Sequence, residues 1–118
     1  MAIFERNTRP ISFVKAALKV FQTFPHAVRI EMELALTAAA EGRKHNDAKP
    51  FKGVDGGVFE IAIKHDGNAF RTIYAVQLGP DVVVIDAFQK KSKSGIKTPK
   101  VDVDRIKERI KRLKETLR

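Results

Sequence analysis

Residues 70–99 read FRTIYAVQLGPDVVVIDAFQKKSKSGIKTP, a stretch with two apolar segments of β type, a Gly-Pro-Asp turn between them and a lysine-dense end. Five lysines lie from residue 90 to residue 100, and no acidic residue lies between Asp86 and Asp102. A strand that leads directly into so many cations builds a fixed cationic site at the edge of a sheet. We therefore expect the other segments of the chain to support this site.

Three consecutive strands are predicted around this stretch. Residues 58–64 alternate apolar and polar side chains, which is the period of a half-buried strand. The sequence HDGN at residues 65–68 is a hairpin signal, so residues 70–78 are expected to return beside the first strand. Residues 82–88 form the third strand, and the VVVI at its start is apolar on both faces, as in a central strand covered by helices.

Helices are predicted on both sides of these strands in the sequence. Apolar residues three or four positions apart indicate two helices before the strands, and Pro25 and Gly42 are their stop signals. Thr98 and Pro99 start a helix after the strands. We expect its narrow apolar stripe to pack on the chain's own sheet, although a partner groove or a dimer seam has the same pattern. These predicted segments are a strand over residues 11–14, helices over 15–24 and 26–41, a polar loop over 42–50 and a helix after residue 99.

The predicted order of elements is β-α-α-β-β-β-α. It indicates an α+β fold in which the helices pack on one face of a small, mainly antiparallel sheet. The length of 118 residues fits one domain over residues 1–118, with a core that needs no metal or disulfide.

The chain has a formal net charge of +9 at pH 7 and contains no cysteine. Such a charge favours polyanionic partners, namely nucleic acid, the ribosome or an acidic protein, although it also serves solubility alone. The lack of cysteine excludes a disulfide framework and a thiolate metal site. No segment has the pattern of a signal peptide or a membrane span, so we expect a cytoplasmic protein with no membrane partner.

The common catalytic motifs are absent from the sequence. It contains no GxxxxGK[ST] phosphate loop, no GxSxG elbow and no pair of histidines at metal-ligand spacing. His26, His45 and His65 lie in different predicted elements, and we expect each to be a surface residue. The sequence therefore predicts neither a metal site nor a cofactor.

A group of cations remains as the candidate site. Arg71 lies early on the second strand of the hairpin, and alternation places Tyr74, the single tyrosine, on the opposite face. The third strand leads into Lys90 and Lys91. Arginine binds phosphate oxygens with two parallel hydrogen bonds, and clustered lysines lower one another's pKa. The group suits RNA cleavage without a metal, in which the ribose 2′-hydroxyl attacks the adjacent phosphate; a nonspecific basic patch is the simpler interpretation.

Two longer segments carry a family resemblance. They are KPFKGVDGGVFEIAIKHDGNAFRTIYAV, residues 49–76, and VVVIDAFQKKSKSGIKTPKVDVDRIKERI, residues 82–110. With a glycine-rich lead into a V-F-E-I strand, a hairpin into F-R-x-x-Y and a strand ending A-F-Q-K-K before a T-P helix start, the chain resembles the phage-derived, HigB-like branch of the RelE/ParE toxin superfamily. The resemblance is strong over about residues 50–110 and is one of pattern only over residues 11–42.

The resemblance implies a toxin of a type II toxin–antitoxin system with a RelE-like microbial-RNase fold. Many such toxins are metal-independent endoribonucleases that cut mRNA in the ribosomal A site and so inhibit translation. The implied partners are mRNA, the ribosome and a cognate HigA-like helix-turn-helix antitoxin, with a heterotetramer as one possible assembly. The charge of +9 predicts that the antitoxin covers the lysines with an acidic segment.

The family's motifs also imply roles for individual residues. Arg71 matches the arginine that clamps the scissile phosphate. Lys64 matches the basic character of its strand in relatives, whereas Glu60 departs from it and is either a base or the structural partner of a lysine. The candidate catalytic residues are Arg71, Lys90, Lys91, Glu60 and Tyr74, and the candidate RNA- or ribosome-binding residues are Lys64, Lys93, Lys97 and Lys100.

One departure from the family leaves the proton-transfer groups open. Some relatives carry a catalytic tyrosine or histidine beyond the last strand, and this chain has neither there. The general base or acid is then a lysine, Glu60 or Tyr74. The alternative functions are ParE-like inhibition of DNA gyrase and a non-enzymatic module that binds nucleic acid or protein.

Overall fold

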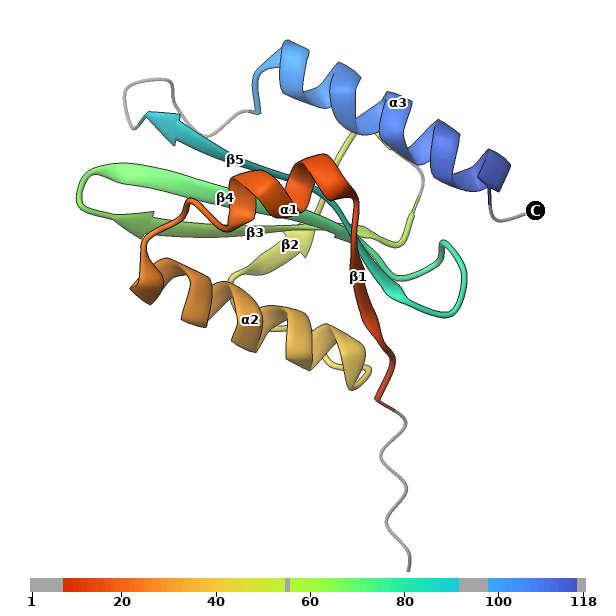
Figure 1. Cartoon of the computed structure of the whole chain (residues 1–118), viewed down its shortest axis with the longest axis horizontal. Coiled ribbons are helices and arrows are strands. Elements are labelled where there is room, and N and C mark those ends of the chain that lie inside the picture. The colour runs from red at the N-terminus through yellow and green to blue at the C-terminus, as the bar shows by residue number, and fades with distance from the viewer. Residues whose placement is uncertain (1–7, 55, 92–97, 117–118) are drawn as a thin grey trace, which may run out of the picture.

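The computed structural model describes residues 8–54, 56–91 and 98–116. In chain order its elements are β1 (Ile11–Phe13), α1 (Lys15–Phe21), α2 (His26–Ala40), β2 (Ala48–Pro50), β3 (Val58–His65), β4 (Asn68–Ala75), β5 (Val82–Lys91) and α3 (Lys100–Thr116) (Figure 1). The five strands form one sheet in the order β1-β5-β4-β3-β2, in which only β1 and β5 are parallel. The predicted α+β class with a mainly antiparallel sheet is confirmed.

A tight hairpin joins β3 to β4. Asp66 and Gly67 both have positive φ, 48° and 77°, as the central residues of a type I′ turn require. The strands on either side pair from His65↔Asn68 at the turn to the far end of the hairpin. The predicted hairpin is confirmed, and its register decides which side chains of β3 and β4 share a face.

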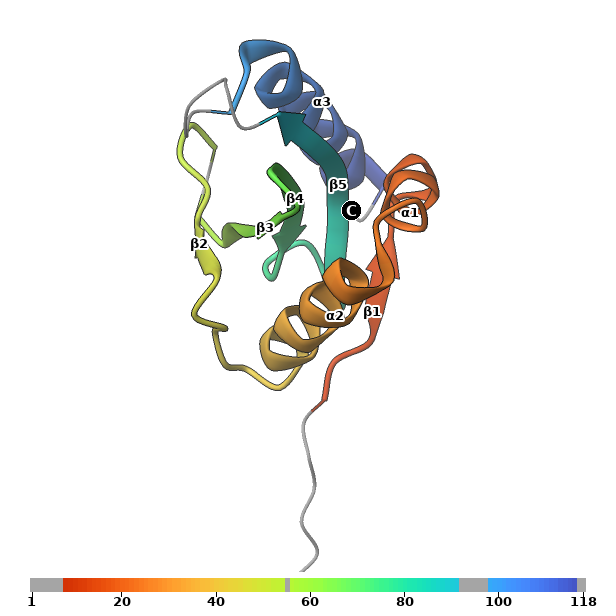
Figure 2. The ribbon, with the colours of Figure 1, turned by 90° about the vertical axis from the view of Figure 1, so that its left-hand side faces the viewer.

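One face of the sheet is covered by α1 and α2. Phe21 of α1 and Val28 and Met32 of α2 belong to a buried cluster that includes Phe70 and Tyr74 of β4. Figure 2 shows both helices beside β1 and β5. Most of the large side chains of the core lie in this cluster, as the predicted helical spacing of apolar residues implies.

The opposite face of the sheet is covered by α3. Ile106 and Ile110 pack on Ile73, Ile85 and Phe88 in a second buried cluster. In Figure 1, α3 lies above the sheet and α2 below it. The expectation that all helices pack on one face is therefore corrected, because β4 and β5 bury side chains on both faces and each face needs its own cover. The expectation that α3 packs on the chain's own sheet is confirmed.

The sheet contains one strand that the sequence did not predict and another that runs past its predicted end. Residues 48–50, expected as part of a loop, form β2 and pair with β3. An edge strand this short carries no alternation of apolar residues that could be recognised. β5 continues past its predicted end at Phe88 to Lys91, which pairs with Asn68. Backbone pairing with β4 extends β5 through residues whose polar side chains give no strand pattern in the sequence.

The apolar surface of α2 is only partly covered. Ile30 and Leu34 are 44% and 54% exposed. They lie one helical turn apart and away from the sheet-facing residues.

Within the described residues, no helix combines the length and the apolar character that crossing a membrane requires.

A buried carboxylate on β5 holds α3 against the sheet. Asp86 is 2% exposed and accepts hydrogen bonds from Arg105 Nε and Arg109 Nη1, each over 2.9 Å. A β-bulge brings it there, because Ile73 pairs with Asp86 whereas Tyr74 pairs with Val84. The two arginines are spaced one turn apart on α3, so both reach the same carboxylate.

We predict that Asp86→Asn destabilises the protein by about 3 kcal/mol, because it removes the buried carboxylate from two partly buried guanidinium groups and leaves Arg105 with Asp102 alone. The measurement is the free energy of unfolding in urea at pH 7. Asp104→Asn removes an exposed carboxylate from the same helix and is the matched control, with an expected change within about 0.5 kcal/mol. Equal effects of the two substitutions would contradict the anchoring role of Asp86.

Candidate active site

Strand register brings three of the predicted residues together on the α3 side of the sheet. Glu60 of β3 pairs with Ile73 of β4, and Arg71 shares a face with Ile73 because the two residues are two positions apart. Lys90 of β5 pairs with Ala69 and so lies on this face as well. Arg71 Nη1 donates a hydrogen bond to Glu60 Oε1 over 2.6 Å. We refer to Glu60, Arg71 and Lys90 as the charged cluster.

The charged cluster is almost withdrawn from solvent. Arg71 and Lys90 are 7% and 5% exposed, and the side chain of Glu60 is 16% exposed. Burial, and after it repulsion from Arg71, lowers the pKa of Lys90 below its ordinary value of 10.5. Attraction to Glu60 and Asp102 acts against this shift without cancelling it. Lys90 therefore gives up its proton more readily than an exposed lysine does.

The start of α3 adds two residues that the sequence analysis did not assign to the site. Thr98 Oγ1 donates a hydrogen bond to Glu60 Oε2 over 3.0 Å, so both carboxylate oxygens of Glu60 have partners. Asp102 lies close enough to Lys90 to affect its pKa. The sequence marked Thr98 as the start of a helix, and nothing in a linear reading connects it with a residue on β3.

The remaining predicted cations lie around the charged cluster or outside the described residues. Lys64 is exposed and lies in one cross-strand row with Ala69 and Lys90. Lys100 is exposed at the first position of α3. Lys91 is the last residue of β5. Lys93 and Lys97 fall outside the described residues.

Tyr74 is separated from the charged cluster by the sheet. It is 1% exposed and belongs to the buried cluster under α1 and α2, where its ring stacks on that of Phe59 at 5.4 Å between centroids. Burial raises the pKa of Tyr74 to about 12. The structure therefore does not bring Tyr74 together with Arg71, in agreement with the predicted alternation of the strand.

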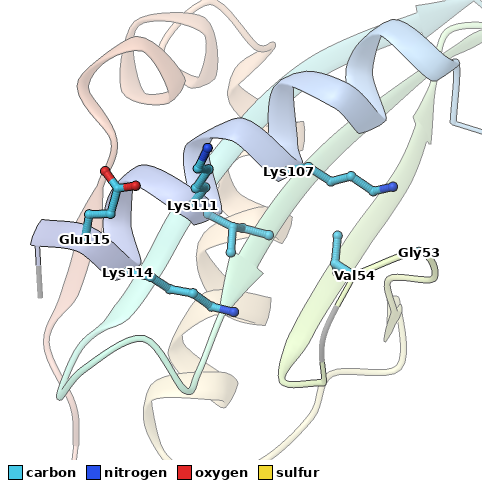
Figure 3. A pocket seen from close by; sticks show the side chains of 7 residues that line it. Gly53, Val54, Lys107, Lys111, Lys114 and Glu115 are labelled. Atoms are coloured by element: carbon cyan, nitrogen blue, oxygen red, sulfur yellow. The ribbon is translucent and has the colours of Figure 1, made fainter. Parts of the chain in front are cut away.

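A groove of about 410 Å³ lies beside the C-terminal half of α3 (Figure 3). Val54 and Ile110 give it apolar walls, and Lys107, Lys111 and Lys114 line it. Figure 3 shows Lys107 reaching from α3 toward Val54. At 1.5 Å per residue, the groove is centred roughly 13 Å along α3 from the turn that meets the charged cluster. It adds a second basic surface on this side of the molecule.

One group of described residues brings potential metal ligands together. Glu31 of α2 and His45 and Asp47 of the following loop have ligand atoms within 4.8 Å of one another. Glu31 and Asp47 are exposed, and His45 Nδ1 accepts the backbone N–H of Asp47 over 3.1 Å. The group includes no residue of the charged cluster.

The charged cluster contains the kinds of group that anion binding and proton transfer require. Arg71 offers the planar fork of donors that matches phosphate oxygens. Lys90 supplies a second cation whose proton is held weakly, and Glu60 supplies a carboxylate that can accept a proton. Preorganised cations in a site that excludes water stabilise a developing anion far more strongly than they do in bulk solvent.

Comparison with known proteins identifies a family and a fold. A model of the family described as phage-derived protein Gp49-like (DUF891) matches residues 19–111. The Escherichia coli toxin RelE, solved in the free state as a double arginine-to-alanine mutant, has a TM-score of 0.58 and 19% identity over 89% of this chain and 97% of that chain. A chain of the toxin–antitoxin complex RelBE2 from Mycobacterium tuberculosis has a TM-score of 0.49 and 14% identity, covering 73% and 95%. No curated protein matches the chain. The RelE-like fold expected from the sequence is confirmed.

We predict that Lys90 makes the stability of the protein depend on pH. Because its pKa is lower in the folded protein than in the unfolded chain, the unfolded chain binds more protons between that lowered pKa and 10.5. The contribution of Lys90 to stability therefore rises as the pH rises through this window. In Lys90→Met this contribution is absent, so the stability of wild type relative to the variant should increase from pH 7 to pH 10.5.

The measurement is the free energy of unfolding of both proteins in urea at several pH values. Each unit by which the Lys90 pKa is lowered corresponds to about 1.4 kcal/mol over the whole window. Lys64→Met, which removes an exposed ammonium group from the same row, controls for the loss of a charge from this face. A difference between wild type and Lys90→Met that stays constant with pH would contradict the prediction.

Proposed function

This chain belongs to the phage-derived Gp49-like family, and we propose that it is the toxin of a type II toxin–antitoxin system, a ribosome-dependent mRNA endonuclease of the cytoplasm. Its RelE fold supports this proposal at the level of architecture. The charged cluster is the observation that carries it, because a paired arginine and carboxylate beside a lysine of lowered pKa are the groups that metal-independent RNA cleavage needs.

In the proposed reaction, the cleaved phosphate lies against Arg71 and Lys90. The ribose 2′-hydroxyl transfers its proton to Glu60 while its oxygen forms a bond to phosphorus. The bond from phosphorus to the 5′-oxygen breaks, and the ammonium group of Lys90 gives that oxygen a proton. The products are a 2′,3′-cyclic phosphate and a 5′-hydroxyl end. The lowered pKa of Lys90 makes its ammonium group a stronger acid than an ordinary lysine.

The sequence left the general base and acid open among a lysine, Glu60 and Tyr74, and the proposal assigns one residue to each role. Glu60 is the base because it is the carboxylate in contact with Arg71, and Lys90 is the acid because it is the buried lysine on the same face. Tyr74 lies on the other face of the sheet and takes no part. Thr98 positions Glu60 through the hydrogen bond to its second oxygen.

Exposed lysines around the charged cluster supply the contacts to ribosomal RNA and mRNA in this proposal. Lys64 and Lys100 lie on the surface near the charged cluster, and the lysines of the α3 groove extend the basic surface along the helix. Such contacts give affinity that falls steeply with salt and carry little sequence information. Selection of a codon would then come from the ribosome and from the charged cluster.

The proposed partner is a cognate HigA-like antitoxin with a helix-turn-helix domain. A net charge of +9 favours a partner with an acidic segment over the basic surface of β5 and α3. A heterotetramer of two toxins and two antitoxins is one assembly in which each basic toxin surface could face an acidic antitoxin segment. Binding of a neutral or basic segment would contradict the electrostatic part of the proposal.

One observation favours the second candidate function, a ParE-like gyrase inhibitor or another binding module. Arg71 and Lys90 are 7% and 5% exposed, and such burial is also what a purely structural ion pair shows. In that case the exposed lysines alone would act, by docking on a macromolecule, and no RNA would be cut.

We predict that Arg71→Ala lowers the rate of mRNA cleavage by about 100- to 1,000-fold, as expected for the loss of a preorganised donor. The measurement is primer extension on a reporter mRNA translated by purified ribosomes. Arg112→Ala is the matched control, because Arg112 lies on the exposed side of α3 with its side chain 76% exposed. The rate of mRNA cleavage by Arg112→Ala should stay within a few-fold of the wild-type rate.

Folding of each variant is checked by circular dichroism, and Arg71→Lys, which keeps the charge in place, is used if Arg71→Ala does not fold. Full cleavage by well-folded Arg71→Ala would contradict the phosphate-binding role of Arg71. Absence of cleavage by well-folded wild type, together with inhibition of DNA supercoiling by gyrase, would support the second candidate function instead.

A further inference from the structure

A cavity of about 260 Å³ lies on the face of the sheet opposite the charged cluster. It is lined by Tyr74 of β4, Phe59 of β3 and Val76, by Arg43 and Lys44 from the loop after α2, and by Arg9. We propose that this cavity binds a small phosphate monoester. The proposal goes beyond mRNA cleavage, because the cavity shares no residue with the charged cluster.

Two of the cations at the cavity have no counter-charge among the described residues. Arg9 donates three hydrogen bonds to the backbone carbonyls of residues 79–81, over 2.8 to 3.2 Å. Lys44 Nζ donates to the carbonyl of Ala48 over 2.9 Å. Neither side chain forms an ion pair within the part of the chain that the structure describes. Neutral carbonyls thus hold both cations in place, and no described residue compensates their positive charges.

The third cation contributes less to the cavity's charge. Arg43 forms an ion pair with Glu41, and its side chain is 67% exposed. The net charge of the cavity therefore comes from Arg9 and Lys44. Fixed charges of one sign beside low-dielectric walls concentrate the field on a bound anion.

Tyr74 supplies a neutral donor to the same cavity. It is 1% exposed, it lines the cavity, and its hydroxyl forms no hydrogen bond with the described residues. A ligand in the cavity that accepts from this hydroxyl gains a hydrogen bond that no described residue provides. With its pKa raised to about 12, the hydroxyl keeps its proton and donates rather than repelling an anion.

The donors and the walls together indicate the class of ligand. Arg9 keeps the two protons of its second terminal nitrogen, Lys44 keeps two, and Tyr74 keeps one, so the donors come from three separate elements. A tetrahedral phosphate presents oxygens in several directions, whereas the two oxygens of a carboxylate lie in one plane. Phe59 and Val76 give apolar walls for the organic part of an ester. The volume is below the roughly 300–1,000 Å³ of sites for drug-sized ligands, so the ester is small.

The test is a titration of ¹⁵N-labelled full-length protein with inorganic phosphate and with methyl phosphate, at constant ionic strength. Backbone amide signals of Gly42 and Val76 report on the cavity, and those of Ala69 and Phe88 report on the charged cluster. We expect saturable shifts at Gly42 and Val76. Tyr74→Phe should fold as wild type does and should weaken binding about five-fold, the equivalent of one hydrogen bond.

Further variants distinguish specific phosphate binding in the cavity from nonspecific attraction of anions to a basic protein. Lys44→Gln should weaken binding at the cavity about ten-fold, and Lys49→Gln, an exposed lysine on β2, should leave it unchanged. Acetate should bind at least ten-fold more weakly than methyl phosphate. Equal binding by wild type and Tyr74→Phe, equal losses in the two lysine variants, acetate binding as tight as phosphate binding, or shifts confined to Ala69 and Phe88 would each overturn the proposal.

Discussion

The buried carboxylate of Asp86 is the contact on which the α3 side of the molecule depends. It lies within β5 and receives Arg105 and Arg109 from two successive turns of α3, so the helix is fixed relative to the strand. A carboxylate that is 2% exposed depends on these partners, because water cannot replace them there. With α3 held in this position, Thr98, two residues before the helix, meets Glu60 of β3, and Glu60 in turn pairs with Arg71.

Cations gather on both faces of the sheet rather than on one. On the α3 face, burial places two cations beside one carboxylate, which leaves a positive site and lowers the pKa of Lys90. On the α2 face, Arg9 and Lys44 are held by backbone carbonyls around the hydroxyl of Tyr74. On the α3 face the cations are buried, whereas on the α2 face Arg9 is half-buried and Lys44 is exposed, and an anionic ligand would add a counter-charge at either place.

Much of the fold was predictable because its signals are local. Strand alternation placed Arg71 and Tyr74 on opposite faces, and the HDGN sequence marked the hairpin. The position of α3 on the second face was not predictable, because an amphipathic stripe shows that a helix packs but not on which side. The contact of Thr98 with Glu60 joins residues 38 positions apart and depends on strand register and on the anchoring of α3. A linear pattern contains neither of these.

In the proposed reaction, Lys90, which lies beside Arg71, donates the proton to the leaving 5′-oxygen. The most direct test compares wild type and Lys90→Met on programmed ribosomes with two mRNAs. One is ordinary, and the other carries sulfur in place of the leaving 5′-oxygen at the cleaved linkage. A thiolate leaves without protonation, so Lys90→Met should lose about 100- to 10,000-fold on the ordinary mRNA and only a few-fold on the sulfur-substituted one. Equal losses on both substrates would show that Lys90 is not the acid.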